Sequence, residues 1–350
     1  MRVLQAMAGA EFGGAEAFFI RLVLALDRAG LDQRVVIRKH PARTQVLRDA
    51  GIEPVELRFG GMMDFGTKAA LKREIQAYQP DLVLTWMNRA TAQCPKGDFV
   101  HVARLGGYYD LKYYRGCDHL VGNTEDIRNY LVSDGWPAER AHYLPNFVPG
   151  HQAEAAPRRD FFTPDGAPLV VALGRLHENK AFDVLLKAMA RVPDAYLWIA
   201  GEGPLRGDLE KIAEANGVKP RTRFLGWRED TAALLAAADI FVCPSRHEPL
   251  GNVVLEAWAQ GTPVIAADSY GPGMLIENRE NGILVPVDDA LTMGKALRNL
   301  FEDDELRHRI ARQGQKAYQA NFTEQIVIDQ YLDFFQSVLK QGDKPQEEPS

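Results

Sequence analysis

Residues 245–258 read SRHEPLGNVVLEAW, and this stretch joins the end of a strand, a glycine turn and the start of a helix. The apolar run 240–244 precedes it and stops at a proline, which is typical of a buried parallel strand. The pattern downstream predicts a helix over 252–260 with Gly251 or Asn252 as its N-cap. A glycine and a proline follow this helix, and a second apolar run begins there.

The start of this helix has the chemistry of an anion site. Its first amides lack intrahelical partners and lie at the positive end of the helix dipole, which favours a diphosphate. Glu248 and Glu256 flank that point. Carboxylates accept hydrogen bonds from sugar hydroxyls, so the combination predicts a nucleotide-sugar site. Either glutamate taken alone is more typical of a solvated surface residue, Glu248 in a loop and Glu256 on an exposed helix face.

The spacing E-x7-E between a strand and a helix, followed by Gly-x-Pro-Val, resembles the C-terminal site of the retaining group 1 glycosyltransferases of family four. Other landmarks of that family follow in the same order: Gly174–Lys180, Ala200–Leu205, Phe224–Gly226 and Asn281–Val285. The resemblance covers most of residues 165–340 and is looser in the N-terminal half. One departure is Leu250, where the family often has Phe. The resemblance implies an α/β protein with the GT-B fold, in which two doubly wound Rossmann-like domains face each other across a cleft.

Length and composition agree with two domains. The chain has 350 residues, which is too long for a typical single core. Its 46% hydrophobic and 25% charged residues are ordinary for a globular protein. We expect these parts: an acceptor-side domain at 1–150, a linker at 151–168, a nucleotide-sugar domain at 169–322, a helix at 323–339 that crosses back to the first domain, and a polar tail at 340–350.

Several classes of protein are disfavoured. Three cysteines without CxxC spacing support neither a disulfide framework nor a cysteine zinc site. The first 31 residues lack the apolar core of a signal peptide, and no apolar run reaches eighteen residues, so we expect a cytoplasmic protein. No basic stripe indicates nucleic acid binding. Residues 1–150 hold 19 Lys and Arg against 17 Asp and Glu, which leaves open a peripheral contact with an anionic inner membrane.

Short apolar runs alternate with helical patterns along both halves, which predicts two parallel sheets covered on both faces. Ligands of such sheets bind beyond the carboxyl ends of the strands. The predicted strands of the first half are 2–7, 34–38, 54–57, 82–86, 100–104 and 119–123, and those of the second are 169–173, 196–200, 222–225, 240–243, 264–267 and 283–285.

In the first half, a glycine-rich loop follows the first predicted strand. Its spacing is not the G-x-G-x-x-G fingerprint of dinucleotide-binding proteins, which weakens a dehydrogenase interpretation. The resemblance implies that Gly13 and Gly14 face the donor phosphates. A tight turn without a ligand is the simpler alternative.

The end of the strand 100–104 carries further residues that are candidates for contact with the acceptor or the donor. The family usually places a histidine here, and this chain has Arg104 with His101 three residues earlier. Arg104 could hold a phosphate or an anionic acceptor, whereas a histidine inside a strand is more often a core residue. Tyr108 and Tyr109 follow, and they suit either sugar stacking or packing.

In the second half, Arg175 and Lys180 lie in one loop at a strand end and suit a diphosphate clamp. We therefore predict catalytic roles for Glu248, Arg175 and Lys180. The donor-binding set is Gly13, Gly14, Arg175, Lys180, Glu202, Leu250, Gly251, Asn252 and Glu256.

The predicted function is transfer of a sugar from a nucleoside diphosphate, UDP rather than GDP, to a hydroxyl of a glycan or glycolipid acceptor. No DxD triplet occurs, so we expect no metal and no cofactor, with cations and helix amides meeting the leaving charge. The resemblance adds retention of anomeric configuration and a context in bacterial envelope polysaccharide or lipopolysaccharide synthesis. A sugar-nucleotide epimerase or phosphorylase on the same fold, and a non-catalytic nucleotide-sugar-binding subunit, remain alternatives.

Overall fold

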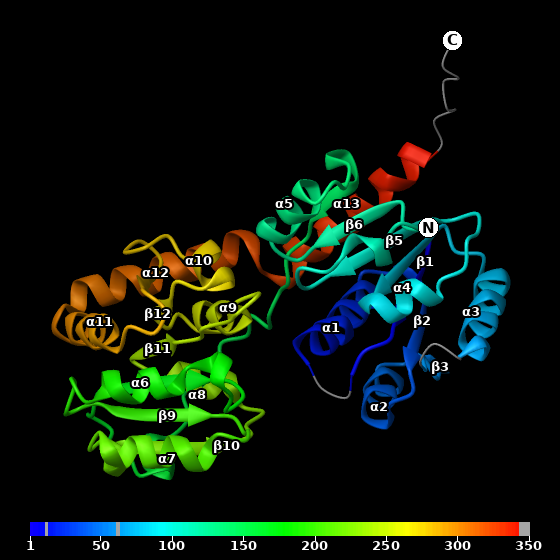
Figure 1. Ribbon diagram of the computed structural model, residues 1–350. Helices are drawn as coiled ribbons and strands as arrows, with labels where there is room; N and C mark the ends of the chain where they lie inside the picture. Colours follow the sequence, from blue (N-terminus) through cyan, green and yellow to red (C-terminus); the bar gives the residue numbers. More distant parts are fainter. Residues whose placement is uncertain (11–12, 61–63, 343–350) are drawn as a thin grey trace. The chain divides into compact units, whose positions relative to one another are not determined.

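The computed structural model describes residues 1–10, 13–60 and 64–342. The chain divides into two units, which are drawn in Figure 1. Unit 1 comprises Met1–Asn146 together with Glu324–Ser350, and unit 2 comprises Phe147–Thr323. The segment 151–168, which the sequence predicts as a linker, lies within unit 2, where Val148 and Ala156 are buried in its core. Residues 343–350 of the predicted polar tail lie outside the described residues.

Unit 1 contains a parallel sheet of seven strands in the order β3-β2-β1-β4-β5-β6-β7. The strands are β1 (Arg2–Met7), β2 (Asp32–Arg38), β3 (Val55–Leu57), β4 (Leu82–Trp86), β5 (Val100–Leu105), β6 (His119–Gly122) and β7 (Ala141–Tyr143). The helices are α1 (Gly14–Arg28), α2 (Pro41–Asp49), α3 (Phe65–Tyr78), α4 (Met87–Gln93), α5 (Glu125–Ser133) and α13 (Glu324–Gly342), with short 3-10 turns η1 (Leu111–Tyr113) and η2 (Ala138–Arg140). Because the sheet is covered on both faces, its central strands β1 and β4 are mostly apolar and almost entirely buried.

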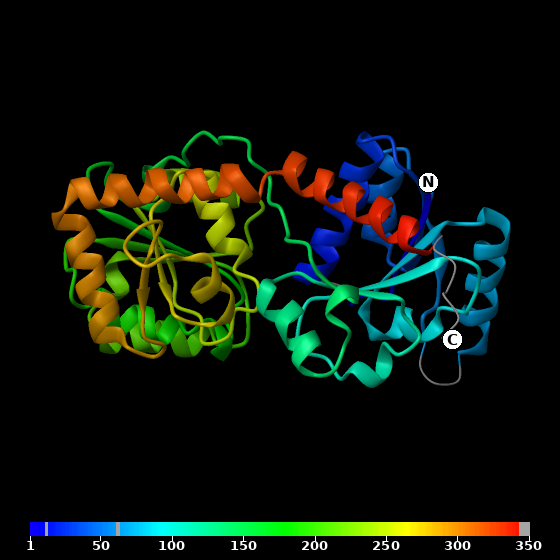
Figure 2. The same ribbon diagram turned by 90° about the horizontal axis from the view of Figure 1, so that it is seen from above.

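Unit 2 repeats the same plan with six parallel strands in the order β10-β9-β8-β11-β12-β13. The strands are β8 (Leu169–Leu173), β9 (Tyr196–Ala200), β10 (Thr222–Gly226), β11 (Ile240–Cys243), β12 (Val264–Ala267) and β13 (Ile283–Val285). The helices are α6 (Phe182–Met189), α7 (Arg206–Ala215), α8 (Thr231–Ala237), α9 (Asn252–Ala259), α10 (Tyr270–Leu275), α11 (Ala290–Glu302) and α12 (Asp304–Asn321), and the 3-10 turns are η3 (Arg158–Phe161), η4 (Glu178–Lys180) and η5 (Lys219–Arg221). Figure 2 shows α6 to α12 around this sheet from above.

No helix in the described ranges 1–10, 13–60 and 64–342 is both long and apolar enough to span a bilayer. The longest, α13, is amphipathic: its apolar face, including Tyr331 and Phe335, is buried against the sheet of unit 1. The sequence predicts this return of the helix at 323–339, and the helix belongs to unit 1.

A pair of histidines lies under α13. The His119 Nδ1 and His142 Nε2 atoms are 3.0 Å apart, and the Phe334 ring of α13 lies 4.7 Å from the His142 ring. Burial lowers the pKa of His119, and burial together with the neighbouring His119 and Arg128 lowers the pKa of His142 to about 4. Both rings are therefore neutral at pH 7, so that one can donate to the other.

We expect this pair to make unit 1 less stable in mild acid. The unfolded chain binds a proton at His142 near pH 6.5, whereas the folded chain binds it only near pH 4, so stability falls as pH drops through this window. Since His142 is half-buried, the loss between pH 6.5 and 5 should be about 1 kcal/mol. Urea unfolding at several pH values measures it. His142→Gln should flatten the profile, and parallel profiles for both proteins would contradict the prediction.

Candidate functional site

The predicted site residues of unit 2 lie at the carboxyl edge of its sheet, where the strand order reverses. The chain runs outward from β8 to β9 and β10, then returns to β11 on the other side of β8. The loops that follow β8 and β11 therefore start side by side at the point where the strand order reverses. In doubly wound sheets this reversal point is where ligands bind.

Glycines at two neighbouring strand ends allow the backbones to approach closely. Gly174 follows β8 with φ of 144°, and Gly201 follows β9 with φ of 147°. A Cβ atom on Gly201 would lie 1.9 Å from the Gly174 carbonyl oxygen, and one on Gly203 would lie 2.4 Å from the Leu176 carbonyl oxygen. Only glycine fits at such distances. The path of the loop that carries Arg175 therefore depends on these glycines.

Three consecutive contacts join the loop after β8, at residues 178–180, to the loop after β11, at residues 246–248. The Arg246 Nη1 donates to the Glu178 carbonyl at 2.7 Å, the His247 amide donates to the Asn179 carbonyl at 3.2 Å, and the Lys180 ammonium pairs with the Glu248 carboxylate. Arg246 also pairs with Asp183 at 2.9 Å and with Asp288 at 2.6 Å. These contacts hold the two loops together at the point where the strand order reverses.

The Lys180–Glu248 pair is the electrostatic centre of this structure. Glu248 is 9% exposed, and its Oε2 also accepts from the Ser245 hydroxyl at 3.5 Å. Burial lowers the pKa of Lys180, but the charge and hydrogen bond of Glu248, with smaller effects of Cys243 and Glu256, outweigh burial and raise that pKa. Lys180 is therefore a cation at neutral pH. Glu256, on α9, also raises the pKa of Lys180. The charges of Lys180, Glu248 and Glu256 therefore interact with one another.

The helix α9 begins beside this pair. Its N-cap Gly251 has φ of 68° and no side-chain cap, and the loop before it is buttressed by α10. A Cβ atom on Gly271 would lie 2.6 Å from the Glu248 carbonyl oxygen and 2.7 Å from the Gly251 nitrogen. The Gly271 amide donates to that Glu248 carbonyl at 2.7 Å. Gly271 thus sets the position of the turn that presents the first amides of α9.

The other predicted residues of unit 2 surround this centre less tightly. Arg175 is exposed, and no described side chain forms an ion pair or hydrogen bond with its guanidinium. Glu202 is exposed after β9, and its carbonyl accepts from the Leu176 amide at 2.9 Å. Leu250 and Asn252 are half-buried on either side of Gly251.

In unit 1, the loop after β1 is held from two sides, although Glu11 and Phe12 lie outside the described residues. The Ala10 amide donates to Glu16 Oε1 at 2.7 Å, and Arg43 Nη2 donates to the Ala10 carbonyl at 2.7 Å. A Cβ atom on Gly13 would lie 2.2 Å from Glu16 Oε2, so a larger residue there would displace the Glu16 carboxylate. Gly14 is the first residue of α1 and has open space around it.

Arg104 and His101 lie in the interior of unit 1, which argues against their predicted contacts with substrate. Arg104 is 4% exposed; its Nε donates to the Tyr331 hydroxyl at 2.8 Å, and its guanidinium lies 4.6 Å from the rings of both Phe18 and Trp86. It therefore anchors α13 to the sheet. His101 is 7% exposed, and its Nε2 lies 3.1 Å from the Thr85 hydroxyl. Burial lowers the pKa of His101, as expected for a neutral core histidine.

The two tyrosines after β5 are the accessible members of that group. Tyr108 is 42% exposed and Tyr109 is 36% exposed. The Tyr108 ring lies edge-on to Tyr130 at 5.3 Å, and its hydroxyl donates to Asp126. These contacts leave both sugar stacking and simple packing open.

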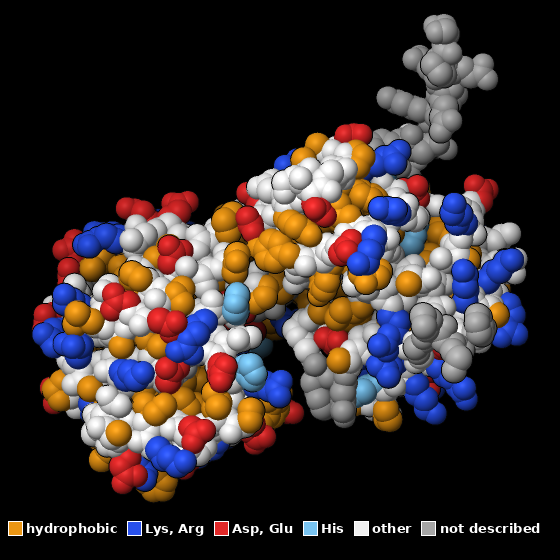
Figure 3. Space-filling view, viewed as in Figure 1, with side chains coloured by type: hydrophobic (Ala, Val, Ile, Leu, Met, Phe, Trp, Pro, Cys, Tyr) orange, Lys and Arg blue, Asp and Glu red, His pale blue; other side chains and the backbone are white. Residues whose placement is uncertain are grey.

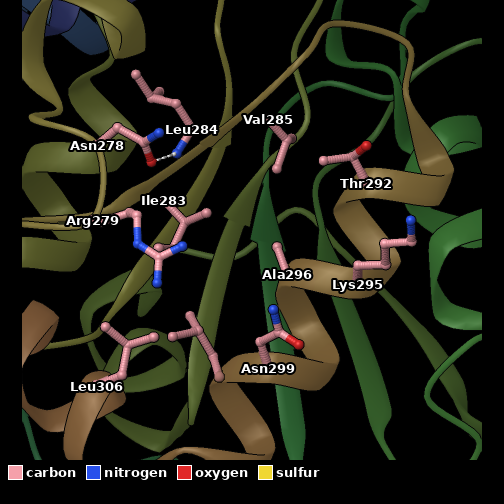
Figure 4. A pocket seen from close by; sticks show the side chains of 11 residues that line it. Asn278, Arg279, Ile283, Leu284, Val285, Thr292, Lys295, Ala296, Asn299 and Leu306 are labelled. Carbon is pink, nitrogen blue, oxygen red and sulfur yellow. Dashed lines mark hydrogen bonds between the residues drawn. The ribbon is translucent and has the colours of Figure 1, made fainter.

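A surface pocket of about 300 Å³ lies elsewhere in unit 2, between β13 and α11. Figure 4 shows its apolar floor, with Ile283, Ala296 and Leu306, and the polar side chains of Arg279 and Lys295 around it. The Asn278 Oδ1 accepts from the Leu284 amide at 3.0 Å, which protects the edge strand β13 from pairing. None of the predicted donor-site residues lines this pocket. Within the described ranges, no three His, Cys, Asp or Glu side chains are grouped as metal ligands.

Sequence reasoning missed several residues that shape these sites: Ser245, Arg246, Gly271, Glu16 and Arg43. The Gly-Pro-Gly run 271–273 was a usable signal of tight packing. The other four are common polar residues. Their partners are either distant in the sequence or of a kind that many polar residues contact, so no local pattern marks them. Only the folded arrangement identifies them.

Comparison with known proteins agrees with this geometry. The family model described as "Glycosyl transferases group 1" matches residues 155–317, and the model described as "Glycosyltransferase Family 4" matches residues 12–150. The two matches fall on the two sheets.

Two curated relatives come from Rhizobium meliloti (strain 1021). The chain is 38% identical to the lipopolysaccharide core biosynthesis glycosyltransferase LpsE, over 93% of this chain and 96% of that protein. It is 34% identical to the corresponding LpsD, over 96% of this chain and 98% of that protein. A crystal structure of Anabaena HepE in complex with UDP matches with a TM-score of 0.85 at 21% identity, over 96% of this chain and 100% of that one. With its two doubly wound parallel sheets in the GT-B arrangement, this chain belongs to the group 1 glycosyltransferases of family 4.

Proposed function

We propose that this glycosyltransferase transfers a hexose from a nucleoside-diphosphate sugar, with UDP favoured as the nucleotide, to a hydroxyl of a glycan or glycolipid acceptor, with retention of configuration and without a metal. The observation that carries the proposal is the Lys180–Glu248 pair beside the start of α9, within the field of Glu256. This arrangement combines a cation, the N-terminus of a helix and two carboxylates, which are the groups that a sugar diphosphate requires.

In this proposal the pair keeps both partners available to the donor. Glu248 uses Oε2 for Lys180 and Ser245, so Oε1 can accept from a sugar hydroxyl. Lys180 has further N–H donors for a phosphate oxygen. Arg175, exposed on the same loop, adds a planar fork for the diphosphate. Donors held in place by the fold stabilise the charge that develops on the leaving group, and Glu256 holds a ribose hydroxyl.

Retention is what the resemblance to the family implies, and because no protein nucleophile is assigned, we propose that leaving group and acceptor react on the same face of the sugar. The bond between the anomeric carbon and the diphosphate oxygen breaks, and the acceptor oxygen bonds to that carbon on the same face. The acceptor proton passes to an oxygen of the leaving diphosphate. Lys180, Arg175 and the α9 amides compensate the charge on the diphosphate, while Glu248 orients the sugar.

The relatives support the context. LpsE and LpsD are named for lipopolysaccharide core biosynthesis, and HepE binds UDP in its crystal structure. We therefore assign this chain to envelope polysaccharide synthesis, with lipopolysaccharide core as the favoured acceptor. A cytoplasmic location and a peripheral contact with the anionic inner membrane complete the proposal.

The test of the proposed chemistry is product analysis. With an α-linked donor, we expect a product whose anomeric proton has the coupling constant of an α-linkage, formed at the same rate with and without EDTA. A β-linked product would exclude retention. A rate that falls more than tenfold with EDTA and returns with Mg²⁺ would exclude metal independence.

Binding of the nucleotide gives a separate prediction. UDP at a hundredfold excess over its Kd should stabilise the protein by about 2.7 kcal/mol. We expect GDP and ADP to stabilise it less at the same concentration, and a chelator to leave the UDP effect unchanged. Thermal unfolding with each nucleotide measures these effects. A larger shift with GDP would contradict the favoured base, and a UDP effect that needs Mg²⁺ would contradict charge compensation by side chains alone.

A further inference from the structure

The carboxyl edge of the unit 1 sheet collects positive charge. The strands β3, β2, β1 and β4 are neighbours and run parallel, so the segments that follow them leave the sheet side by side. Five cations lie on or after these strand ends, and we call them the basic edge: Arg38, Lys39, Arg43, Arg58 and Arg89. Figure 3 shows Lys and Arg side chains gathered over this part of unit 1, near α2 and β3. Register confirms the proximity, because Arg38 pairs with Leu57 across β2 and β3.

The carboxylates of this region are engaged by other donors. Glu16 accepts from the Ala10 amide at 2.7 Å, and Glu56 accepts from the Thr44 hydroxyl. Asp64 accepts from the Gly60 amide at 2.6 Å and from Thr67 at both its amide and hydroxyl. These carboxylates already have hydrogen-bond partners in the folded protein.

The cations of the basic edge differ from other arginines of unit 1 in their lack of ion pairs with described carboxylates. Arg34 pairs with Glu74 at 3.6 Å and Arg48 pairs with Glu53 at 2.6 Å. Among the described residues, no member of the basic edge forms an ion pair with a carboxylate. Arg89 donates to a carbonyl, that of Phe59, at 3.1 Å. The positive charge of this edge is therefore only partly compensated within the protein.

Arg43 lies at the base of the edge. It is 6% exposed; Nη2 donates to the Ala10 carbonyl, whereas Nη1 is buried and has no partner within the described ranges. Burial lowers the pKa of Arg43, Glu16 raises it, and the charge of Arg38 lowers it further. A buried charged donor without a partner is costly. An anion between Arg38 and Arg43 would supply the missing acceptor and relieve their repulsion.

We propose that the basic edge is a binding site for an anionic group of the acceptor, a phosphate or a carboxylate. This inference rests on the proposed function, because it assigns the donor diphosphate to unit 2, where Lys180 and α9 receive it. Arginine forks suit the planar, bidentate geometry of such groups. The site would select acidic acceptors over neutral glycans of the same shape.

The test uses inorganic phosphate as a probe, with UDP present at saturation so that the unit 2 site is occupied. The variant Arg38→Gln/Arg58→Gln removes two accessible members and leaves Arg43 in place to hold the loop. Lys72→Gln, on the exposed face of α3, is the control and removes one positive charge of unit 1 that lies outside the basic edge. Phosphate affinity comes from the rise of the unfolding midpoint with phosphate concentration. We expect about tenfold weaker affinity in the double variant and wild-type affinity in Lys72→Gln.

The outcomes distinguish the possible anionic ligands of the basic edge. Equal phosphate affinity in wild type and double variant, or no phosphate effect in the wild type, would overturn the site. Loss of UDP stabilisation in the double variant would show that these cations serve the donor instead. Unchanged phosphate affinity with lost binding to vesicles of phosphatidylglycerol would assign the edge to a lipid surface. If the wild type binds phosphate through this edge but no nucleotide, the proposed function fails and the anion site stands.

Discussion

Replacing Glu248 with alanine is expected to lower kcat/KM by about 10³, and replacing Lys180 with alanine by about 10² to 10³. The first change removes the group that we propose orients the sugar and also the partner that fixes Lys180. The second removes the cation that we propose compensates charge on the leaving diphosphate. Because the two side chains act together, the double variant should lose little more than the worse single variant. Initial rates of sugar transfer measure all three.

The control for this experiment is Lys211→Ala, which removes an exposed ammonium from α7 of the same unit. Its rate should equal that of the wild type. The Lys180 and Glu248 side chains are only 22% and 11% exposed, so loss of either partner should lower the free energy of unfolding by about 1–3 kcal/mol. Thermal unfolding will show that the variants are folded under assay conditions. A folded Glu248→Ala protein with wild-type kcat/KM would remove this site from the mechanism.

The second large effect is expected at a glycine. Gly201→Ala would place a Cβ atom 1.9 Å from the Gly174 carbonyl oxygen, at a φ of 147° that disfavours side chains. Strain and overpacking together should lower the free energy of unfolding by about 3–5 kcal/mol. The displaced backbone carries Arg175, so donor binding should weaken as well. Urea unfolding and UDP titration of the same protein measure the two effects.

Gly207→Ala is the matched substitution in the same segment of chain. Gly207 lies in α7 and a Cβ atom there would have open space. Alanine favours a helix over glycine by about 1 kcal/mol, so this variant should be slightly more stable and fully active. Similar unfolding free energies for both variants would mean that the close approach of β8 and β9 can relax without cost.

Much of the fold was predictable because the hydrophobic runs and turn residues of the sequence match the strands and turns that form. The strands 240–243 and 264–267 are buried apolar runs bounded by turn residues, and they appear in the structure with those bounds. Apart from the 3-10 turns, three short elements were missed: α4, β7 and α10. The strand β7 has three residues, and α10 contains two glycines and a proline, so neither carries a recognisable period.

Site residues were less predictable than elements. Arg104 follows the strand pattern and lies where the resembled family has a functional residue, yet it contacts Tyr331, which is 227 residues away in the sequence. A charged residue at a strand end looks the same in the sequence whether it faces substrate or anchors a helix. The role of such a residue depends on its partner. The partner of Arg104, Tyr331, lies on α13, which comes from the far end of the chain.

Periodicity and turn chemistry act over a few residues, so the amino-acid pattern was enough to predict two parallel α/β halves and the glycine turn before α9. Which charges meet depends instead on how segments that are distant in the sequence fold together. Lys180 and Glu248 are 68 residues apart and pair because the strand order reverses between β8 and β11. Electrostatic energy depends on distance and burial, and both follow from how the strands are ordered in the sheet.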